Sequence, residues 1–113
     1  MPDLNAIRNG DHTQLTDEDL AGTNLEEATL RHADLTDATL TNADLTRADL
    51  SDASLAGATL QNADLTETAL HKAGLINTTL RDADLNEADL SRAFVSRGVA
   101  LTRADLTRAD LSK

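Results

Sequence analysis

The sequence predicts an all-β solenoid, in which the chain coils around a core of Leu side chains. Leu stands at every fifth position from Leu15 to Leu90, sixteen times in succession. Two residues before these positions runs a second column of small residues, which is Ala in fourteen of twenty five-residue units, or pentads. The other three positions of each pentad are mostly polar. A repeat this regular makes the pentad itself the structural unit.

Neither an α-helix nor a flat strand can bury this Leu column. Five residues at about 100° each advance about 140° past a full turn, so the Leu side chains of a helix would wind around every face. An odd spacing in a flat strand sends successive Leu side chains to opposite faces. The chain must therefore turn once per pentad. The small residue and the Leu then point inward, and the residue between them points outward.

The two residues after each Leu are expected to form the corner between one short extended segment and the next. Stacked coils satisfy one another's backbone groups at a spacing of about 4.8 Å. Asp, Asn, Thr and Ser suit the corners, because their side chains bond nearby backbone amides. The alternative of a disordered acidic chain is disfavoured, since disorder does not align nineteen Leu residues in one repeat.

The pattern A(D/N)LXX, which reads ADLTR at residues 43–47 and again at 104–108, resembles the pentapeptide-repeat protein family. The resemblance covers about nine tenths of the chain. It implies a right-handed quadrilateral β-helix with four pentads per coil, a number that the spacing alone does not give. Twenty pentads would then make about five coils.

The chain divides into an N-terminal cap, residues 1–12, and the repeat domain, residues 13–113. Leu4 and Ile7 are spaced for one face of a helix and Gly10 suits its end, so we expect a short helix that shields the first coil. After Val95 the Leu column slips by one residue. We expect a bulge near Gly98, because Gly tolerates the unusual backbone angles of a bulge.

The C-terminal coil has no comparable covering segment in the sequence. An open β edge over Leu106 and Leu111 invites a partner, and we expect a homodimer through this coil, with Leu106 and Leu111 in the contact. The alternative is that the positive charges of Arg103, Arg108 and Lys113 guard the edge.

Composition excludes several classes of partner. Twenty acidic and ten basic residues give a net charge of -10, which repels phosphate backbones and anionic membrane surfaces alike. Direct nucleic-acid binding and membrane binding are therefore not expected. The partner is expected to be another protein. Since the sequence has neither a long apolar run nor a secretory signal region, we expect a cytoplasmic protein.

The sequence offers no catalytic, cofactor-binding or metal-binding residues. Cys is absent, and His12, His32 and His71 are not at a metal-ligand spacing. A Gly-rich phosphate loop and a nucleophile elbow are missing as well. The acidic run at residues 17–19 lacks the staggered ligands and the Gly of a calcium loop. We therefore expect a protein that is not an enzyme and needs no cofactor.

Charge is concentrated on one side of the expected four-sided coil. That side carries eight acidic residues against Arg47 and Arg108, a net charge of -6. We call these eight residues the acidic stripe: Glu26, Glu27, Asp44, Asp64, Glu67, Asp84, Glu87 and Asp105. Charge also divides along the chain, because residues 1–67 hold fourteen acids and three bases whereas residues 68–113 hold six and seven.

These features predict a non-enzymatic interaction or structural module that presents an acidic rod surface, in a process that the sequence does not identify. A plain solvated face that keeps a Leu-filled rod soluble is the alternative for the stripe. The alternative function, implied by the family resemblance, is a DNA mimic that modulates a type II topoisomerase such as DNA gyrase. Those relatives are longer and carry a C-terminal dimerisation element, so their contact residues cannot be transferred to this chain.

Overall fold

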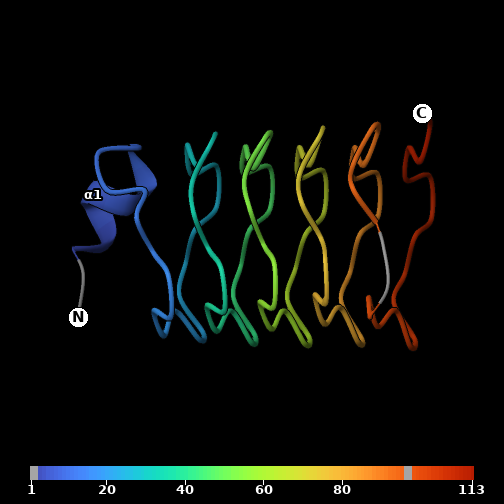
Figure 1. Ribbon diagram of the computed structural model, residues 1–113, viewed down its shortest axis with the longest axis horizontal. Helices are drawn as coiled ribbons and strands as arrows, with labels where there is room; N and C mark the ends of the chain where they lie inside the picture. Colours follow the sequence, from blue (N-terminus) through green and yellow to red (C-terminus); the bar gives the residue numbers. More distant parts are fainter. Residues whose placement is uncertain (1–2, 96–97) are drawn as a thin grey trace.

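The computed structural model describes residues 3–95 and 98–113, which wind into a rod of stacked coils (Figure 1). The rod measures 33 × 20 × 19 Å along its principal axes. Neighbouring coils pair in parallel through residues that lie four pentads apart, such as Asp44 with Asp64. Because the chain turns once in every pentad, it makes four turns between two such partners, and the coil therefore has four sides.

The pairing between coils uses one residue per pentad, the outward residue between the small residue and the Leu. The N–H of Leu45 donates to the carbonyl of Asp64 at 2.8 Å, and the N–H of Asp64 donates to the carbonyl of Ala43 at 2.9 Å. In the described part of the chain, the pairing consists of isolated bridges rather than extended strands. A two-residue corner in every pentad leaves too few extended residues for a longer strand.

Each corner is a tight turn whose second residue has a positive φ. At one of them the N–H of Ala48 donates to the carbonyl of Leu45 at 2.9 Å, and Arg47 has a φ of 57°. This geometry is that of a type II turn, which favours Gly or Asn at the position of positive φ. Sixteen described residues other than Gly nevertheless occupy this region. The sequence analysis predicted the corners but not this backbone conformation.

The core consists of the two inward columns. The Leu side chains from Leu15 to Leu85 are almost fully buried, and Leu90 is 5% exposed. Ala lies beside them in most pentads, because the narrow tube leaves little space there. Thr68 and Thr78 replace Ala in two pentads and are also buried. Their hydroxyls donate to the carbonyls of Leu45 and Leu55 at 2.7 and 2.8 Å, so neither hydroxyl lacks a partner.

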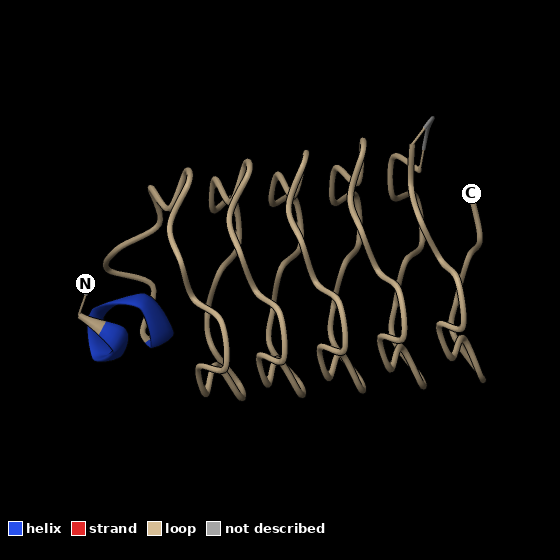
Figure 2. Ribbon diagram, turned by 90° about the horizontal axis from the view of Figure 1, so that it is seen from below, coloured by secondary structure: helices blue, strands red, loops and turns tan. Residues whose placement is uncertain are grey.

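One short helix, α1 (Leu4–Arg8), lies at the N-terminal end of the rod, opposite the C-terminus (Figure 2). Asp3 is its N-cap, since the Asp3 side chain accepts a hydrogen bond from the N–H of Asn5 at 2.9 Å. Ile7 is fully buried in the core cluster. The carbonyl of Arg8 accepts the N–H of Thr29 at 2.8 Å, which ties the helix to the first coil. Within the described residues, no helix has the length and apolar character needed to cross a membrane.

The register changes once, in the segment where the sequence places its one-residue slip. Gly74 pairs with Phe94, which lies four pentads further on, whereas the partner of Thr79 is Ala100, one position beyond that spacing. Gly98 has a φ of 83°, a conformation that Gly adopts without strain. Residues 96–97, which belong to the expected bulge, lie outside the described residues.

Candidate interaction surface

The centre of the acidic stripe is a column of Asp residues in register. Asp44, Asp64, Asp84 and Asp105 are joined one to the next by parallel bridges, with Asn24 at the N-terminal end of the column. The bridge places these side chains on successive coils, about 4.8 Å apart. The structure thus brings four of the eight stripe residues into a single line along one side of the rod.

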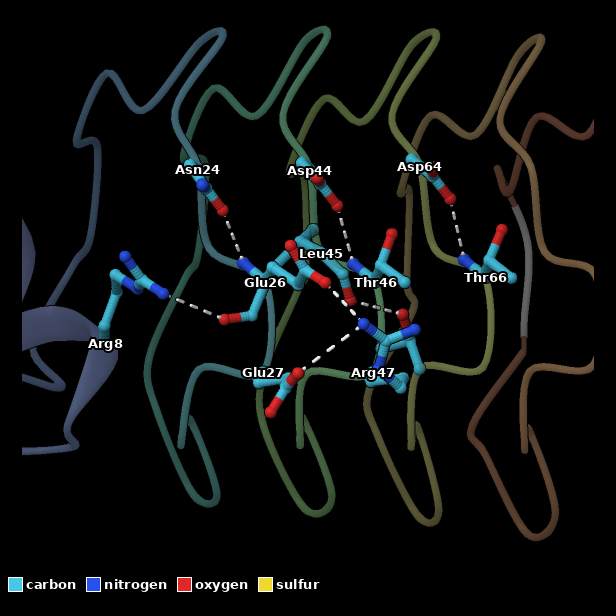
Figure 3. Close-up of polar contacts among 11 residues, drawn as sticks. Arg8, Asn24, Glu26, Glu27, Asp44, Leu45, Thr46, Arg47, Asp64 and Thr66 are labelled. Atoms are coloured by element: carbon cyan, nitrogen blue, oxygen red, sulfur yellow. Dashed lines mark hydrogen bonds and ion pairs between the residues drawn. The ribbon is translucent and has the colours of Figure 1, made fainter.

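Each carboxylate in this column is held by the corner that follows it. The Oδ1 atoms of Asp44 and Asp64 each accept a backbone N–H two residues on, at 3.0 Å (Figure 3). Asp84 makes the same bond at 3.0 Å and Asp105 at 2.9 Å. The sequence analysis assigned such bonds to the corner residues, whereas here they come from the outward residue before the Leu. One carboxylate oxygen is therefore oriented by the backbone, which fixes the direction of the charge.

The same contacts shift the acidity of some of these groups. The hydroxyl of Thr46, together with its N–H, holds the pKa of Asp44 below the usual range. On another side of the rod, the hydroxyl and N–H of Thr36 lower the pKa of Asp34 in the same way. Both carboxylates therefore stay ionised at lower pH than a free Asp would.

The Glu residues of the stripe are partly neutralised by Arg side chains from the next coil. Arg47 forms ion pairs with Glu26 and with Glu27, the latter at 3.5 Å, and Figure 3 shows it reaching toward both. Arg108 pairs with Glu87 at 2.9 Å. These contacts lie toward the two ends of the stripe.

The middle of the stripe keeps its charge. Among the ion pairs of the described residues, none includes Asp64, Glu67 or Asp84. Glu67 lies on an exposed corner, and Asp64 and Asp84 are half-buried beside it. The strongest negative surface of this side is therefore its central part.

Ion pairs between coils also occur elsewhere on the rod, and the sequence analysis missed them. Arg31 pairs with Asp52 at 3.3 Å, and Arg103 pairs with Asp82 at 2.6 Å. In both cases the partners are separated in sequence by four pentads and one further residue, so opposite charges at that separation were the available signal. The Arg side chains are 52% and 70% exposed and the Asp side chains 28% and 27%, so solvent screens each pair and each contributes little to stability.

Side chains that could bind a metal ion are not gathered together in the part of the chain that the structure describes. Within residues 3–95 and 98–113, no group of three or more His, Cys, Asp or Glu side chains is placed to hold a metal ion. The three His residues are scattered over the surface: His71 contacts Ser91 at 2.9 Å, and His12 contacts the carbonyl of Gln14 at 3.2 Å.

The C-terminal end of the rod contains an apolar hollow of about 520 Å³. Leu106 and Leu111, the expected dimer contacts, both line it, and Leu111 is 59% exposed. Arg103 and Arg108, which together with Lys113 were the alternative explanation as guards of this edge, form ion pairs with acidic residues of the preceding coil. The homodimer through the C-terminal coil stays a prediction.

A parallel coil with four turns, two inward columns and polar outer columns defines a β-helical repeat protein. The chain belongs to the pentapeptide repeat family, whose sequence model, described as Pentapeptide repeats (8 copies), matches residues 13–52, 48–86 and 64–98. Membership implies a right-handed quadrilateral β-helix. Proteins of this family are generally structural or interaction modules. A comparison with curated protein sequences finds no match.

Several solved structures are similar to this chain. A pentapeptide repeat protein of the Arabidopsis thaliana thylakoid lumen is 28% identical with a TM-score of 0.81, and the match covers 85% of this chain and 66% of that one. A pentapeptide repeat protein of Nostoc PCC 7120 is 30% identical with a TM-score of 0.60, over 87% and 80% of the two chains. The protein Rfr23 of the cyanobacterium Cyanothece 51142 is 26% identical with a TM-score of 0.51, over 86% of each chain. This chain thus spans 66% of the length of the Arabidopsis protein.

Proposed function

We propose that this chain is a non-enzymatic protein-interaction or structural module, and that the acidic stripe is the surface it presents to a basic protein partner. The observation that carries the proposal is the line of oriented Asp carboxylates in the middle of the stripe. A scaffold that already holds its charges in place loses little freedom on binding, which favours association.

The chemistry of the stripe suits Lys and Arg side chains. Asp64 and Asp84 each have one oxygen bonded to the backbone, which leaves the second carboxylate oxygen to accept bonds from a cation. Complementary charge of this kind directs encounter and selects partners more than it sets affinity. We therefore expect binding that weakens as salt concentration rises.

The architecture supports the same proposal. We propose a rod of about five coils whose N-terminal end is shielded by α1. The burial of Ile7 and the bond from Thr29 to Arg8 support this role for the helix. Sides that stay in register over the length of the rod can present a continuous binding surface, as solenoids commonly do.

Neutral substitutions test the stripe without breaking its backbone bonds. The stripe variant replaces Asp64 and Asp84 with Asn, and Glu67 and Glu87 with Gln. A matched control variant carries Asn in place of Asp34, Asp37, Asp49 and Asp89, which lie on other sides. Each variant removes four negative charges, so both have a net charge of -10 + 4 = -6. Asn and Gln keep a side-chain oxygen that accepts hydrogen bonds.

The probe is an oligolysine peptide, titrated by calorimetry in about 0.15 M salt, where charges are screened beyond about 8 Å. We expect the stripe variant to bind about tenfold more weakly than the original chain and the control variant to change by less than about threefold. Lys at the four stripe positions should abolish binding. Equal losses in the stripe and control variants would show that only total charge matters, and the proposal would fail.

A second candidate function is a DNA-mimicking modulator of a type II topoisomerase such as DNA gyrase. The linear column of Asp carboxylates favours it, because DNA also presents its charges in lines. We rank this function second because the rod carries charge less densely than DNA does. A net charge of -10 over a length of 33 Å is about one charge per 3.3 Å, against about one per 1.7 Å in B-DNA. A supercoiling assay with purified gyrase tests this second function. Unchanged supercoiling at a large molar excess of this chain would exclude the DNA-mimic function.

A further inference from the structure

One side of the rod carries an apolar, uncharged surface that lies outside the acidic stripe. Its bridge positions are Ser54, Gly74 and Phe94, which pair one to the next across three successive coils. Ile76 is 46% exposed and Phe94, the only aromatic residue of the chain, is 64% exposed. We call this surface the neutral face; its outward residues are Ser54, Ala56, Gly57, Gly74, Ile76, Asn77 and Phe94.

Neither the backbone conformation of Gly74 nor the space around it requires Gly at this position. The φ of Gly74 is not positive, unlike those of Gly57 and Gly98, so its backbone accepts any residue. A Cβ atom at this position would lie 4.0 Å from the carbonyl oxygen of Ala53, an ordinary van der Waals distance that causes no clash. Nine other bridge positions carry Asp without difficulty. A Gly inside a β segment often marks a bulge, a tight bend or a site where a ligand or another backbone approaches closely. Gly74 pairs in regular register with Ser54 and Phe94, which argues against a bulge and leaves close approach as the reason we favour.

We infer that the neutral face binds a second copy of this chain, with the two rods antiparallel and related by a two-fold axis that passes over Gly74. Gly74 lies one coil from Ser54 and one coil from Phe94. A two-fold axis across the rod at Gly74 therefore places Phe94 of each copy over Ser54 and Ala56 of the other. The protruding ring meets a flat surface in both directions, as a self-complementary interface requires.

The centre of this arrangement is apolar. On the axis Gly74 faces Gly74, which lets the backbones approach, and Ile76 faces Ile76 of the second copy. Among the outward residues of the neutral face that the structure describes, none is charged, so two chains of net charge -10 avoid direct repulsion between these residues. The acidic stripe, by contrast, exposes a column of Asp residues from Asp44 to Asp105, which disfavours pairing of like copies through that side.

Charge at the rim favours the antiparallel orientation. Asp52, Lys72 and Arg92 occupy equivalent corner positions beside the neutral face, on the same three coils. The two-fold axis brings Arg92 of each copy opposite Asp52 of the other, which forms two ion pairs by symmetry. It also places Lys72 opposite Lys72 of the second copy, and these two exposed cations offset part of that gain. Arg92 is exposed, and Asp52 also pairs with Arg31 of its own chain at 3.3 Å.

The size of the contact sets its strength. Three coils at about 4.8 Å span about 14 Å, and a rod 20 Å across then offers about 300 Å² per copy. Stable interfaces bury at least about 1,000 Å² in total. The dimer is therefore weak, with a dissociation constant on the order of 0.1–1 mM.

Sedimentation equilibrium up to about 1 mM protein in about 0.15 M salt tests the dimer. The mean mass should rise from 12.0 kDa toward twice that value. Gly74→Asp and Phe94→Ser should each keep the circular dichroism spectrum and leave a monomer. Thr79→Asp adds the same charge to the same coil on another side, and it should dimerise like the original chain.

Charge exchange tests the orientation. Arg92→Asp should weaken the dimer at least about tenfold in dissociation constant, and the double variant Arg92→Asp with Asp52→Arg should restore it. A chain that stays monomeric at the highest concentration would overturn the inference, as would a dimer unaffected by Gly74→Asp. Loss of the dimer in Leu111→Asp but not in Gly74→Asp would assign the contact to the C-terminal hollow instead. None of these outcomes depends on the oligolysine result, so the two proposals can fail separately.

Discussion

Asp44 and Asp64 lie one above the other on neighbouring coils, joined by the hydrogen bond from the N–H of Leu45 to the carbonyl of Asp64 at 2.8 Å. Two like charges directly opposite in a β ladder repel each other. Each carboxylate here is compensated by the N–H of a Thr two residues on, at 3.0 Å. The column therefore keeps its charge through local bonds rather than through counter-ions.

This compensation predicts how one residue contributes to stability as pH changes. The pKa of Asp44 is lower in the folded chain than in a free Asp, first because of the Thr46 hydroxyl and then its N–H. Its stabilising contribution is therefore complete above the unfolded pKa, near 3.8, and is lost as pH falls through the lower folded value. Asp44→Asn should thus destabilise the chain more at pH 6 than at pH 2, in urea unfolding at both pH values. Asp34→Asn should show the same dependence on pH. An equal loss of unfolding free energy at pH 6 and pH 2 would contradict this account.

The Leu column predicts a large effect for truncation in the middle coils. Leu60 is 1% exposed, so Leu60→Ala removes buried apolar surface and leaves a cavity. The expected loss of unfolding free energy is about 2–5 kcal/mol, measured by urea denaturation. Leu111→Ala, at an exposed position, should change it by less than about 1 kcal/mol. Similar values for both variants would refute the inward placement of Leu60.

The buried Thr residues of the small column predict a smaller effect. Thr68→Val keeps the shape of the side chain but removes the hydroxyl that donates to the carbonyl of Leu45. That carbonyl retains the N–H of Ala48 as a donor, at 2.9 Å. The loss of stability should therefore be about 1 kcal/mol, the net worth of one hydrogen bond. Thermal unfolding checks it, and a gain in stability would contradict the prediction.

The corners predict that a Gly can be better than the residue present. His32 is exposed and has a φ of 61°, where residues other than Gly lose about 1–2 kcal/mol. His32→Gly should stabilise the chain, by less than about 1 kcal/mol because Gly gains freedom in the unfolded state. His32→Val should destabilise it, since a β-branched residue fits this region poorly.

A control for the corners is Gln61→Val, at the first corner position, where φ is not positive. It should change the free energy of unfolding by less than about 0.5 kcal/mol. If His32→Val and Gln61→Val were equally tolerated in urea unfolding, backbone strain at the second corner position would not be the cause.

Much of the fold could be predicted from two columns of residues. The spacing of Leu15, Leu20 and their successors requires one turn per pentad, and burial of these side chains confirms the inward placement. Spacing does not set how many turns close a coil, because any regular polygon repeats its corners equally. Four sides came from the family resemblance, and pairing between residues four pentads apart agrees with it.

The surface was harder to predict, since it depends on contacts between coils. The ion pair of Arg47 with Glu27 and that of Arg108 with Glu87 each join a corner of one coil to the corresponding corner of the next. The positive φ of the corners left a signal that went unused, because Gly, Asn or Asp often stands there, as at Gly57 and Asn62.

The four-pentad period of the coil separates the length of the rod from the pattern on its sides. Removing one whole coil would shorten the rod, yet every remaining residue would stay on its own side. Removing a single pentad would rotate everything beyond it by a quarter turn and carry the column of Asp64 onto a neighbouring side. The extra residue near Gly98 causes no such rotation, because Asp84 still pairs with Asp105. Each side can therefore acquire its own surface chemistry independently, while the coil lengthens or shortens in whole steps.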